Sequence, residues 1–92
     1  MTKTYHVYIL LCENGSYYTG YTKDLNSRVQ QHVKGIGARY TQMHKPTKLV
    51  YVEPYKTIKE AMIRERAIKR LRHIEKSKLA KQGRNVDLTK SH

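Results

Sequence analysis

A carboxylate interrupts the apolar stripe of a helix that the sequence predicts over Thr57–Leu71. The residues at helical spacing in this stretch are Ile58, Ala61, Met62, Glu65 and Ile68. At about 100° per residue, Glu65 falls near the centre of the face that should turn toward the core. Because an unpaired carboxylate loses several kcal/mol when it leaves water, Glu65 must either have a structural partner or line a pocket that needs its charge.

A second predicted helix, over about Leu25–Lys34, carries two more polar groups near its apolar stripe. His32 projects inside that stripe, and Arg28 lies beside it, one turn earlier in the chain. Arginine can bind phosphate through both arms of its planar fork, and histidine can position water or move a proton. Two structural alternatives stay open: a satisfied core histidine at His32, and an ion pair between Arg28 and Glu65 that bridges the two helices.

Two tripeptides that contain tyrosine lie in strands predicted to be neighbours. Val7–Ile9 belongs to a buried strand over Tyr5–Cys12, and Tyr18–Gly20 belongs to a strand over Ser16–Tyr21. Asn14-Gly15 between them is a hairpin-turn sequence. Taken alone, each tyrosine is explained by core packing, because its ring supplies apolar bulk.

The length of the hairpin loop decides whether the two tyrosines share a face of the sheet. A two-residue turn pairs Leu11 with Tyr18 and places Tyr8 and Tyr18 on opposite faces. A three-residue loop, or a bulge near Glu13–Ser16, brings both to one face. The sequence leaves the two registers open.

The remaining segments complete a small mixed fold. A third strand is predicted over about Thr47–Val52, where residues alternate between the faces, and Pro54 closes it. Thr57–Glu60 has the pattern of a capping box, and a short helix over Ile74–Gln82 follows. The stretch 35–40 is predicted to be a loop. The order β-β-α-β-α-α favours an α+β domain over residues 1–83, with a small three-stranded mixed or antiparallel sheet flanked by helices, and a polar, flexible tail over 84–92.

With these residues in place, the chain resembles a GIY-YIG nuclease domain. Val7–Ile9 stands where that family has Gly-Ile-Tyr or Val-Tyr, and Tyr18–Gly20 stands where it has Tyr-Ile-Gly. The spacing from Arg28 to His32 and the Arg-Glu-x-x-Ile-Lys pattern at Arg64–Lys69 complete the match. The resemblance covers about residues 5–69, and it is closer to the small stand-alone bacterial members, the UPF0213-like proteins. Residues 85–88 resemble a C-terminal Asn-Pro-x-x-Asp-Leu element of small relatives without its proline.

The resemblance implies Mg²⁺- or Mn²⁺-dependent hydrolysis of a phosphodiester bond, with catalytic residues Tyr8, Tyr18, Arg28, His32 and Glu65. Glu65 would hold the metal, and one carboxylate suffices because Mg²⁺ keeps most of its waters. Arg28 would bind the phosphate and its developing charge, and Tyr18 would take the proton from the attacking water. Tyr8 and His32 would position that water or assist proton transfer. Two more residues are predicted to line the site, Gly20 and Tyr40.

The charge balance indicates a polyanionic partner. Nineteen Lys and Arg residues against seven Asp and Glu give a formal charge of +12 on 92 residues. Nucleic acid is favoured over a membrane surface, because no basic segment has large apolar residues opposite it. The residues predicted to contact a phosphate backbone follow Glu65 in the chain: Lys69, Arg70, Arg72, Lys76 and Lys78. The alternative is a solvated surface that keeps a small domain in solution.

The favoured function is a metal-dependent endonuclease that acts on DNA in repair or recombination. The alternatives are a nucleic-acid-binding module with weak or no cleavage, and an RNA-directed nuclease. Since no base-reading module accompanies the basic residues, a protein partner is expected to supply specificity. The single cysteine, Cys12, excludes an internal disulfide, and the longest apolar run, Val7–Cys12, is too short to span a membrane. The sequence therefore predicts a cytoplasmic protein.

Overall fold

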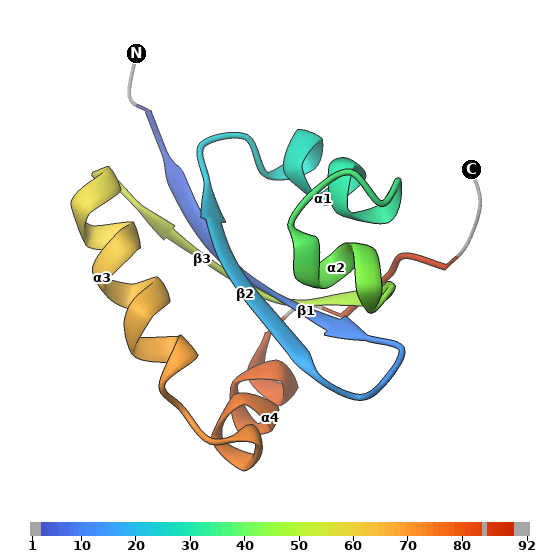
Figure 1. Ribbon diagram of the computed structural model, residues 1–92. Coiled ribbons are helices and arrows are strands. Elements are labelled where there is room, and N and C mark those ends of the chain that lie inside the picture. Colours follow the sequence, from blue (N-terminus) through green and yellow to red (C-terminus); the bar gives the residue numbers. More distant parts are fainter. Residues whose placement is uncertain (1–2, 84, 90–92) are drawn as a thin grey trace.

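Residues 3–83 and 85–89, which the computed structural model describes, form four strands and four helices. In chain order these are β1 (Tyr5–Cys12), β2 (Tyr17–Thr22), α1 (Leu25–Val33), α2 (Arg39–Met43), β3 (Pro46–Tyr55), α3 (Ile58–Lys69), α4 (His73–Gln82) and β4 (Val86–Asp87). The strands pair antiparallel in the order β2-β1-β3-β4. Helices α3 and α4 cover one face of this sheet, and α1 and α2 lie on the other (Figure 1). No helix of the described residues is long and apolar enough to cross a membrane.

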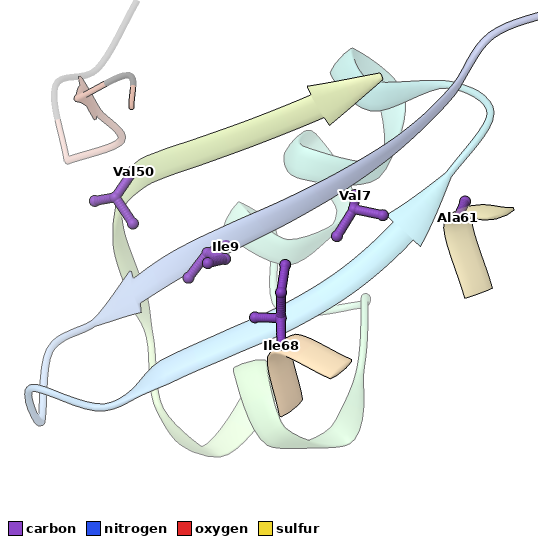
Figure 2. Packing of buried hydrophobic residues seen from close by; sticks show 5 residues of the cluster. All are labelled: Val7, Ile9, Val50, Ala61 and Ile68. Atoms are coloured by element: carbon purple, nitrogen blue, oxygen red, sulfur yellow. The ribbon is translucent and has the colours of Figure 1, made fainter. Parts of the chain in front are cut away.

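The core on the α3 side is built on β1, which lies between β2 and β3 in the sheet. Val7 and Ile9 are fully buried on that face. Figure 2 shows that Ala61 and Ile68 of α3 belong to the same cluster as these two residues, with Val50 of β3 beside Ile9. Helix α3 therefore lies across β1 and β2, and the spacing of its two buried residues sets which of its side chains face the sheet.

A second cluster fills the α1 side of the sheet. Tyr8 and Leu10 of β1 pack there with Val29 of α1 and Leu49 of β3. A strand that is buried on both faces needs apolar bulk at successive positions, which is why β1 has a nearly continuous apolar sequence. Tyr8 is the one residue of this cluster that also brings a polar group into the core, and that hydroxyl needs a partner.

The β1–β2 hairpin closes with a three-residue loop, Glu13–Gly15. The amide of Cys12 donates to the carbonyl of Ser16 at 2.8 Å, and the amide of Gly15 donates to the carbonyl of Cys12 at 2.9 Å. Gly15 has φ of +84°, a conformation that costs glycine little. The positive φ at the third loop position is typical of a hairpin with a type I turn and a bulge.

This loop decides the register that the sequence left open. Tyr8 pairs with Gly20, and Leu10 pairs with Tyr18. Tyr8 and Tyr18 are therefore on the same face of the sheet, because positions two apart along a strand share a face. The three-residue loop is confirmed, and the two-residue turn is wrong.

β3 departs from regular alternation at a bulge. Tyr51 pairs with Ile9 and Leu49 pairs with Leu10, so Val50 is an extra residue between two consecutive pairs. Val50 and Tyr51 both pack on the α3 side, whereas Leu49 packs on the α1 side. The strict alternation predicted for this strand is therefore wrong at Val50, since a bulge places two successive residues on one face.

β3 also continues past Pro54 to Tyr55, so the prediction that Pro54 closes the strand is wrong. β4 pairs only with Lys48 and Leu49. Among the described residues, the later part of β3 thus has no strand on that side, and a residue without an amide proton is tolerated there.

The sheet has four strands, and the predicted three is wrong. β4 lies in the segment predicted as a tail, where Leu88 packs into the cluster on the α1 side and its amide donates to the carbonyl of Thr47 at 2.8 Å. Residues 84 and 90–92 of that segment lie outside the described residues, and the domain boundary at residue 83 stays a prediction. The predicted loop 35–40 is wrong at its last two residues, because Arg39 and Tyr40 begin α2, a helix of five residues.

Glu53 ties α3 to the sheet. Its carboxylate accepts hydrogen bonds from the hydroxyls of Tyr51 and Tyr55, and from Nε of Arg64 at 2.8 Å. Burial opposes the charge, but the three donors outweigh it and hold the pKa of Glu53 below its usual range. The ion pair fixes α3 against β3, and Thr57 caps the start of the same helix by accepting from the amide of Glu60 at 3.2 Å.

Candidate active site

Tyr8, Tyr18 and His32 form an aromatic group between the sheet and α1. The ring centroids of Tyr8 and His32 are 5.7 Å apart, those of Tyr18 and His32 are 5.1 Å apart, and those of the two tyrosines are 6.4 Å apart. Three of the five predicted catalytic residues are therefore brought together. β1 and β2 supply the tyrosines through their register, and α1 supplies the histidine from its buried side.

His32 is fully buried and has a hydrogen-bond partner at each ring nitrogen. Its Nε2 lies 2.7 Å from the hydroxyl oxygen of Tyr8, and its Nδ1 lies 2.7 Å from Oγ1 of Thr41 in α2. Thr41 is itself buried and donates its hydroxyl proton to the carbonyl of Ala38 at 2.9 Å. The histidine is thus a core residue whose hydrogen-bonding groups are satisfied. It also connects Tyr8 to Thr41 in a series of hydrogen bonds.

Both ends of the Tyr8–His32 hydrogen bond are electrically neutral near pH 7. Burial, with a smaller effect from Tyr18, raises the pKa of Tyr8 above its ordinary value. Burial and then the positive charge of Arg28 lower the pKa of His32 to about 4. Tyr8 therefore keeps its proton, and His32 does not take one up from the solvent.

Two glycines, which have no side chain, provide the space that Tyr8 and His32 occupy. A Cβ at Gly20 would lie 2.5 Å from the hydroxyl oxygen of Tyr8, and a Cβ at Gly37 would lie 2.6 Å from Nδ1 of His32. Gly20 was predicted to line the site and does contact Tyr8. Gly37 was not predicted, because a glycine in an irregular loop gives no periodic signal that links it to a particular side chain.

Tyr18 presents a free hydroxyl at the edge of this group. Its hydroxyl has no hydrogen-bond partner among residues 3–83 and 85–89. Its ring stacks on that of Tyr40, with centroids 6.2 Å apart and planes 21° apart. Tyr40 is 38% exposed and donates its hydroxyl proton to Oγ of Ser16 at 2.5 Å. Tyr40, which was predicted to line the site, therefore lies in direct contact with Tyr18.

Arg28 lies on α1 close to Tyr8 and His32. Its hydrogen bond to the Tyr8 hydroxyl and its charge oppose the rise in the pKa of Tyr8, and its charge helps burial to lower the pKa of His32. Its Nη1 donates to Oε1 of Gln31 at 2.9 Å. In the described part of the chain, no carboxylate forms an ion pair with it. The alternative of a structural ion pair between Arg28 and Glu65 is therefore wrong.

Glu65 lies on the sheet-facing side of α3, between Ala61 and Ile68. Its side chain is only 15% exposed, and Oε2 lies 3.5 Å from Nζ of Lys69, one turn later. The predicted stripe is wrong at Ile58, which is 47% exposed because α3 begins beyond the edge of the core. Glu65 makes no hydrogen bond to the aromatic group, yet its charge acts on Tyr8 and raises the pKa of that hydroxyl slightly.

The donor set suits a hard divalent cation. No group of three His, Cys, Asp or Glu side chains within the described ranges could hold a metal by itself. Mg²⁺ does not require such a group, because it retains waters and takes one or two carboxylates together with substrate phosphate oxygens. Glu65 is a largely buried carboxylate whose one ion pair with the described residues is the long contact to Lys69, so it is the residue that would hold the metal.

The predicted phosphate-contacting residues lie at the end of α3 and along α4. Arg72 forms an ion pair with Glu75, in which its Nε lies 3.4 Å from Oε1, and Lys76 is half-buried. The others are exposed: Lys69, Arg70 and Lys78. These elements cover the face of the sheet opposite α1 and α2 (Figure 1), so the predicted residues do not surround the aromatic group. A second set of exposed basic residues accompanies α1 and α2, namely Lys34, Arg39 and Lys45.

The buried His32 predicts how stability responds to acid. Below about pH 6.5 the unfolded chain binds a proton at His32 that the folded chain accepts only near pH 4, so the free energy of unfolding falls across that range. The loss assigned to His32 is about 3 kcal/mol, because each unit of pKa difference is worth about 1.4 kcal/mol. Urea unfolding of the protein and of His32→Gln from pH 7 to pH 4 measures it as the difference between the two curves.

The matched control is His44→Gln, which removes a histidine that is only partly buried. This variant is expected to lose stability in acid as the unaltered protein does. Parallel curves for His32→Gln and the unaltered protein would contradict a depressed pKa at His32.

The family model for the GIY-YIG catalytic domain matches residues 4–78 of the chain. The chain therefore belongs to the GIY-YIG family, whose domain implies nuclease-type activity on nucleic acid and whose members generally use divalent metal ions. The resemblance and the α+β fold predicted from the sequence are confirmed.

Two of the three similar proteins described next carry the name UPF0213. The chain is 47% identical over 79 residues to the UPF0213 protein of Staphylococcus aureus strain Mu3, an alignment that covers 86% of this chain and 96% of the relative. The solution structure of the UPF0213 protein BH0048 from Bacillus halodurans is similar with a TM-score of 0.55 and 39% identity, covering 86% of this chain and 84% of that one. The protein EF2693 from E. faecalis is similar with a TM-score of 0.59 and 34% identity, covering 87% and 85%.

Proposed function

We propose that this protein is a metal-dependent endonuclease that hydrolyses phosphodiester bonds in DNA. The observation that carries the proposal is Arg28, a partly buried guanidinium beside Tyr8 and His32 that no described carboxylate neutralises. A cation held in this way is available to bind an anion, and a phosphate matches its planar fork. The role in repair or recombination, the cytoplasmic location and the protein partner stay predictions.

The two tyrosines are suited to different tasks. Tyr18 has a hydroxyl without a hydrogen-bond partner among the described residues, so it can take the proton of the attacking water. The step uses the phenolate form of Tyr18, whose oxygen receives that proton. Tyr8 instead stays protonated and is hydrogen-bonded to His32. Its oxygen can accept a hydrogen bond from water.

Glu65 and Arg28 approach the substrate from different elements. Glu65 on α3 would hold Mg²⁺ or Mn²⁺, which when bound supplies positive charge that polarises the phosphodiester. Arg28 on α1 binds a non-bridging oxygen of the same phosphate and stabilises the charge that develops there. The scissile phosphate would therefore lie where both side chains reach it, near Tyr18 on the edge strand β2.

The proposal is tested by cleavage of labelled duplex DNA, single-stranded DNA and RNA, each with Mg²⁺, Mn²⁺ or EDTA. Cleavage of DNA that requires metal is the expected result, and Glu65→Gln protein purified in parallel controls for contaminating nucleases. Metal-dependent cleavage of RNA alone would replace DNA by RNA as the substrate. Binding without cleavage in every arm would contradict the enzyme and favour a binding module.

The basic residues of α4 predict a salt dependence of DNA binding. Replacing Lys76 and Lys78 by Gln is expected to weaken binding to unrelated sequences alike and to flatten the slope of log affinity against log salt by about 0.9 per lost phosphate contact. Fluorescence anisotropy on labelled duplex at several salt concentrations measures that slope.

A matched double variant, Lys34→Gln with Lys45→Gln, removes the same charge from the α1–α2 side. It is expected to leave the slope nearly unchanged. If the slope flattens for this control and not for Lys76→Gln with Lys78→Gln, the backbone is bound on the α1–α2 side and α4 serves solubility.

A further inference from the structure

We propose that Thr41 is a positioning residue that fixes the tautomer of His32 and thereby directs the hydroxyl proton of Tyr8. The catalytic consequence of this inference rests on the proposed nuclease function, whereas the tautomer itself does not. Thr41 lies in α2, and its side chain touches His32 directly.

The direction of the hydrogen bonds follows from the single proton on the hydroxyl of Thr41. That proton is donated to the carbonyl of Ala38 at 2.9 Å, and a carbonyl oxygen can only accept. Oγ1 of Thr41 is therefore an acceptor toward Nδ1 of His32, 2.7 Å away. Nδ1 must then carry the ring proton of the neutral imidazole.

The other ring nitrogen is consequently without a proton. Nε2 of His32 can only accept, so the hydroxyl of Tyr8, 2.7 Å away, must donate to it. The proton of Tyr8 thus points to His32, and the lone pairs of its oxygen are left to accept from other groups. In the proposed reaction, this arrangement lets the oxygen of Tyr8 accept a hydrogen bond from a water, while the hydroxyl of Tyr18 remains available.

The opposite tautomer is disfavoured by the closeness of the packing. His32 and Thr41 are almost completely buried, so no solvent reaches the bonds between them. A proton on Nε2 would leave Nδ1 and Oγ1 of Thr41 as two facing acceptors unless Thr41 gave up its bond to Ala38. Gly37 lies against Nδ1 so closely that a Cβ there would clash, so the ring has little room to move. The lowered pKa of His32 agrees with a neutral ring.

Nitrogen NMR of imidazole ¹⁵N-labelled protein at pH 7 tests the tautomer directly, without any assay of activity. The signals of His32 are those absent from His32→Gln. The expected result is a proton on Nδ1 in the unaltered protein and in Thr41→Ser, which keeps the hydroxyl. Thr41→Val, of similar volume but without the hydroxyl, is expected to lose this single tautomer. A proton on Nε2 in the unaltered protein would overturn the proposal, and that result needs no variant to fold.

Cleavage kinetics on the same proteins test the catalytic consequence. Thr41→Val is expected to lower kcat about 10- to 100-fold, the usual effect of removing a partner that orients a functional histidine, with KM little changed. Thr41→Ser should retain most of kcat. Equal kcat in Thr41→Val and the unaltered protein would overturn the positioning role. If the unaltered protein cleaves nothing, the proposed function fails, and the nitrogen signals still decide the tautomer.

Discussion

Glu65→Gln is expected to abolish metal-dependent cleavage while the protein stays folded. Glu65 is the carboxylate on the sheet-facing side of α3, and its charge reaches Tyr8 across the edge of the site. An amide of the same shape is a poor ligand for a hard cation, and the metal contributes several kcal/mol to stabilising the transition state. The loss is expected to be about a thousandfold or more, since each 1.4 kcal/mol is a factor of ten.

The stability of Glu65→Gln should be nearly unchanged. The pair with Lys69 is long, at 3.5 Å, and Lys69 is mostly exposed, so it contributes at most about 0.5 kcal/mol. Circular dichroism melting beside the cleavage assay measures both quantities on one sample. Glu60→Gln on the same helix is the control for charge and is expected to retain activity. A Glu65→Gln protein that melts much earlier yet cleaves normally per folded molecule would make Glu65 a structural residue.

Arg28→Lys is the second large effect, although it keeps the positive charge. Lysine offers a compact ammonium and no planar fork, so it cannot donate two parallel hydrogen bonds to a phosphate. The expected loss in kcat/KM is about 100-fold or more, comparable to removing one donor to a developing oxyanion. Because Arg28 forms no ion pair with a carboxylate of the described residues and lysine keeps the positive charge, folding should tolerate the change.

Arg39→Lys provides the matched control for Arg28→Lys. Arg39 is an exposed arginine of α2 with no hydrogen bond or ion pair of its side chain to the described residues, and its replacement is expected to leave the rate unchanged. Comparable rates for Arg28→Lys and the unaltered protein would show that only the charge of Arg28 matters. A rise in KM with kcat unchanged would place Arg28 in substrate binding alone.

The sequence by itself determined the elements that carry the candidate site and the chemical character of most of the candidate residues. β1 was evident from its continuous apolar run, because only a strand covered on both faces needs one. The polar residue in the stripe of α3 pointed to Glu65, since a helix places Ala61, Glu65 and Ile68 on one face whatever surrounds it. These signals are local, so they survive without knowledge of the fold.

The tertiary structure alone decided what each site residue touches. Asn14-Gly15 fits a two-residue turn as well as it fits the last two positions of a three-residue loop, and only the pairing of Leu10 with Tyr18 selects between them. α2, with five residues, is too short for its own sequence to stabilise. Helix α2 is stabilised by a contact from α1, the hydrogen bond between His32 and Thr41. Contacts between segments far apart in the chain leave no periodic trace, so the bonding of His32 and the absence of an Arg28–Glu65 pair could come only from the folded molecule.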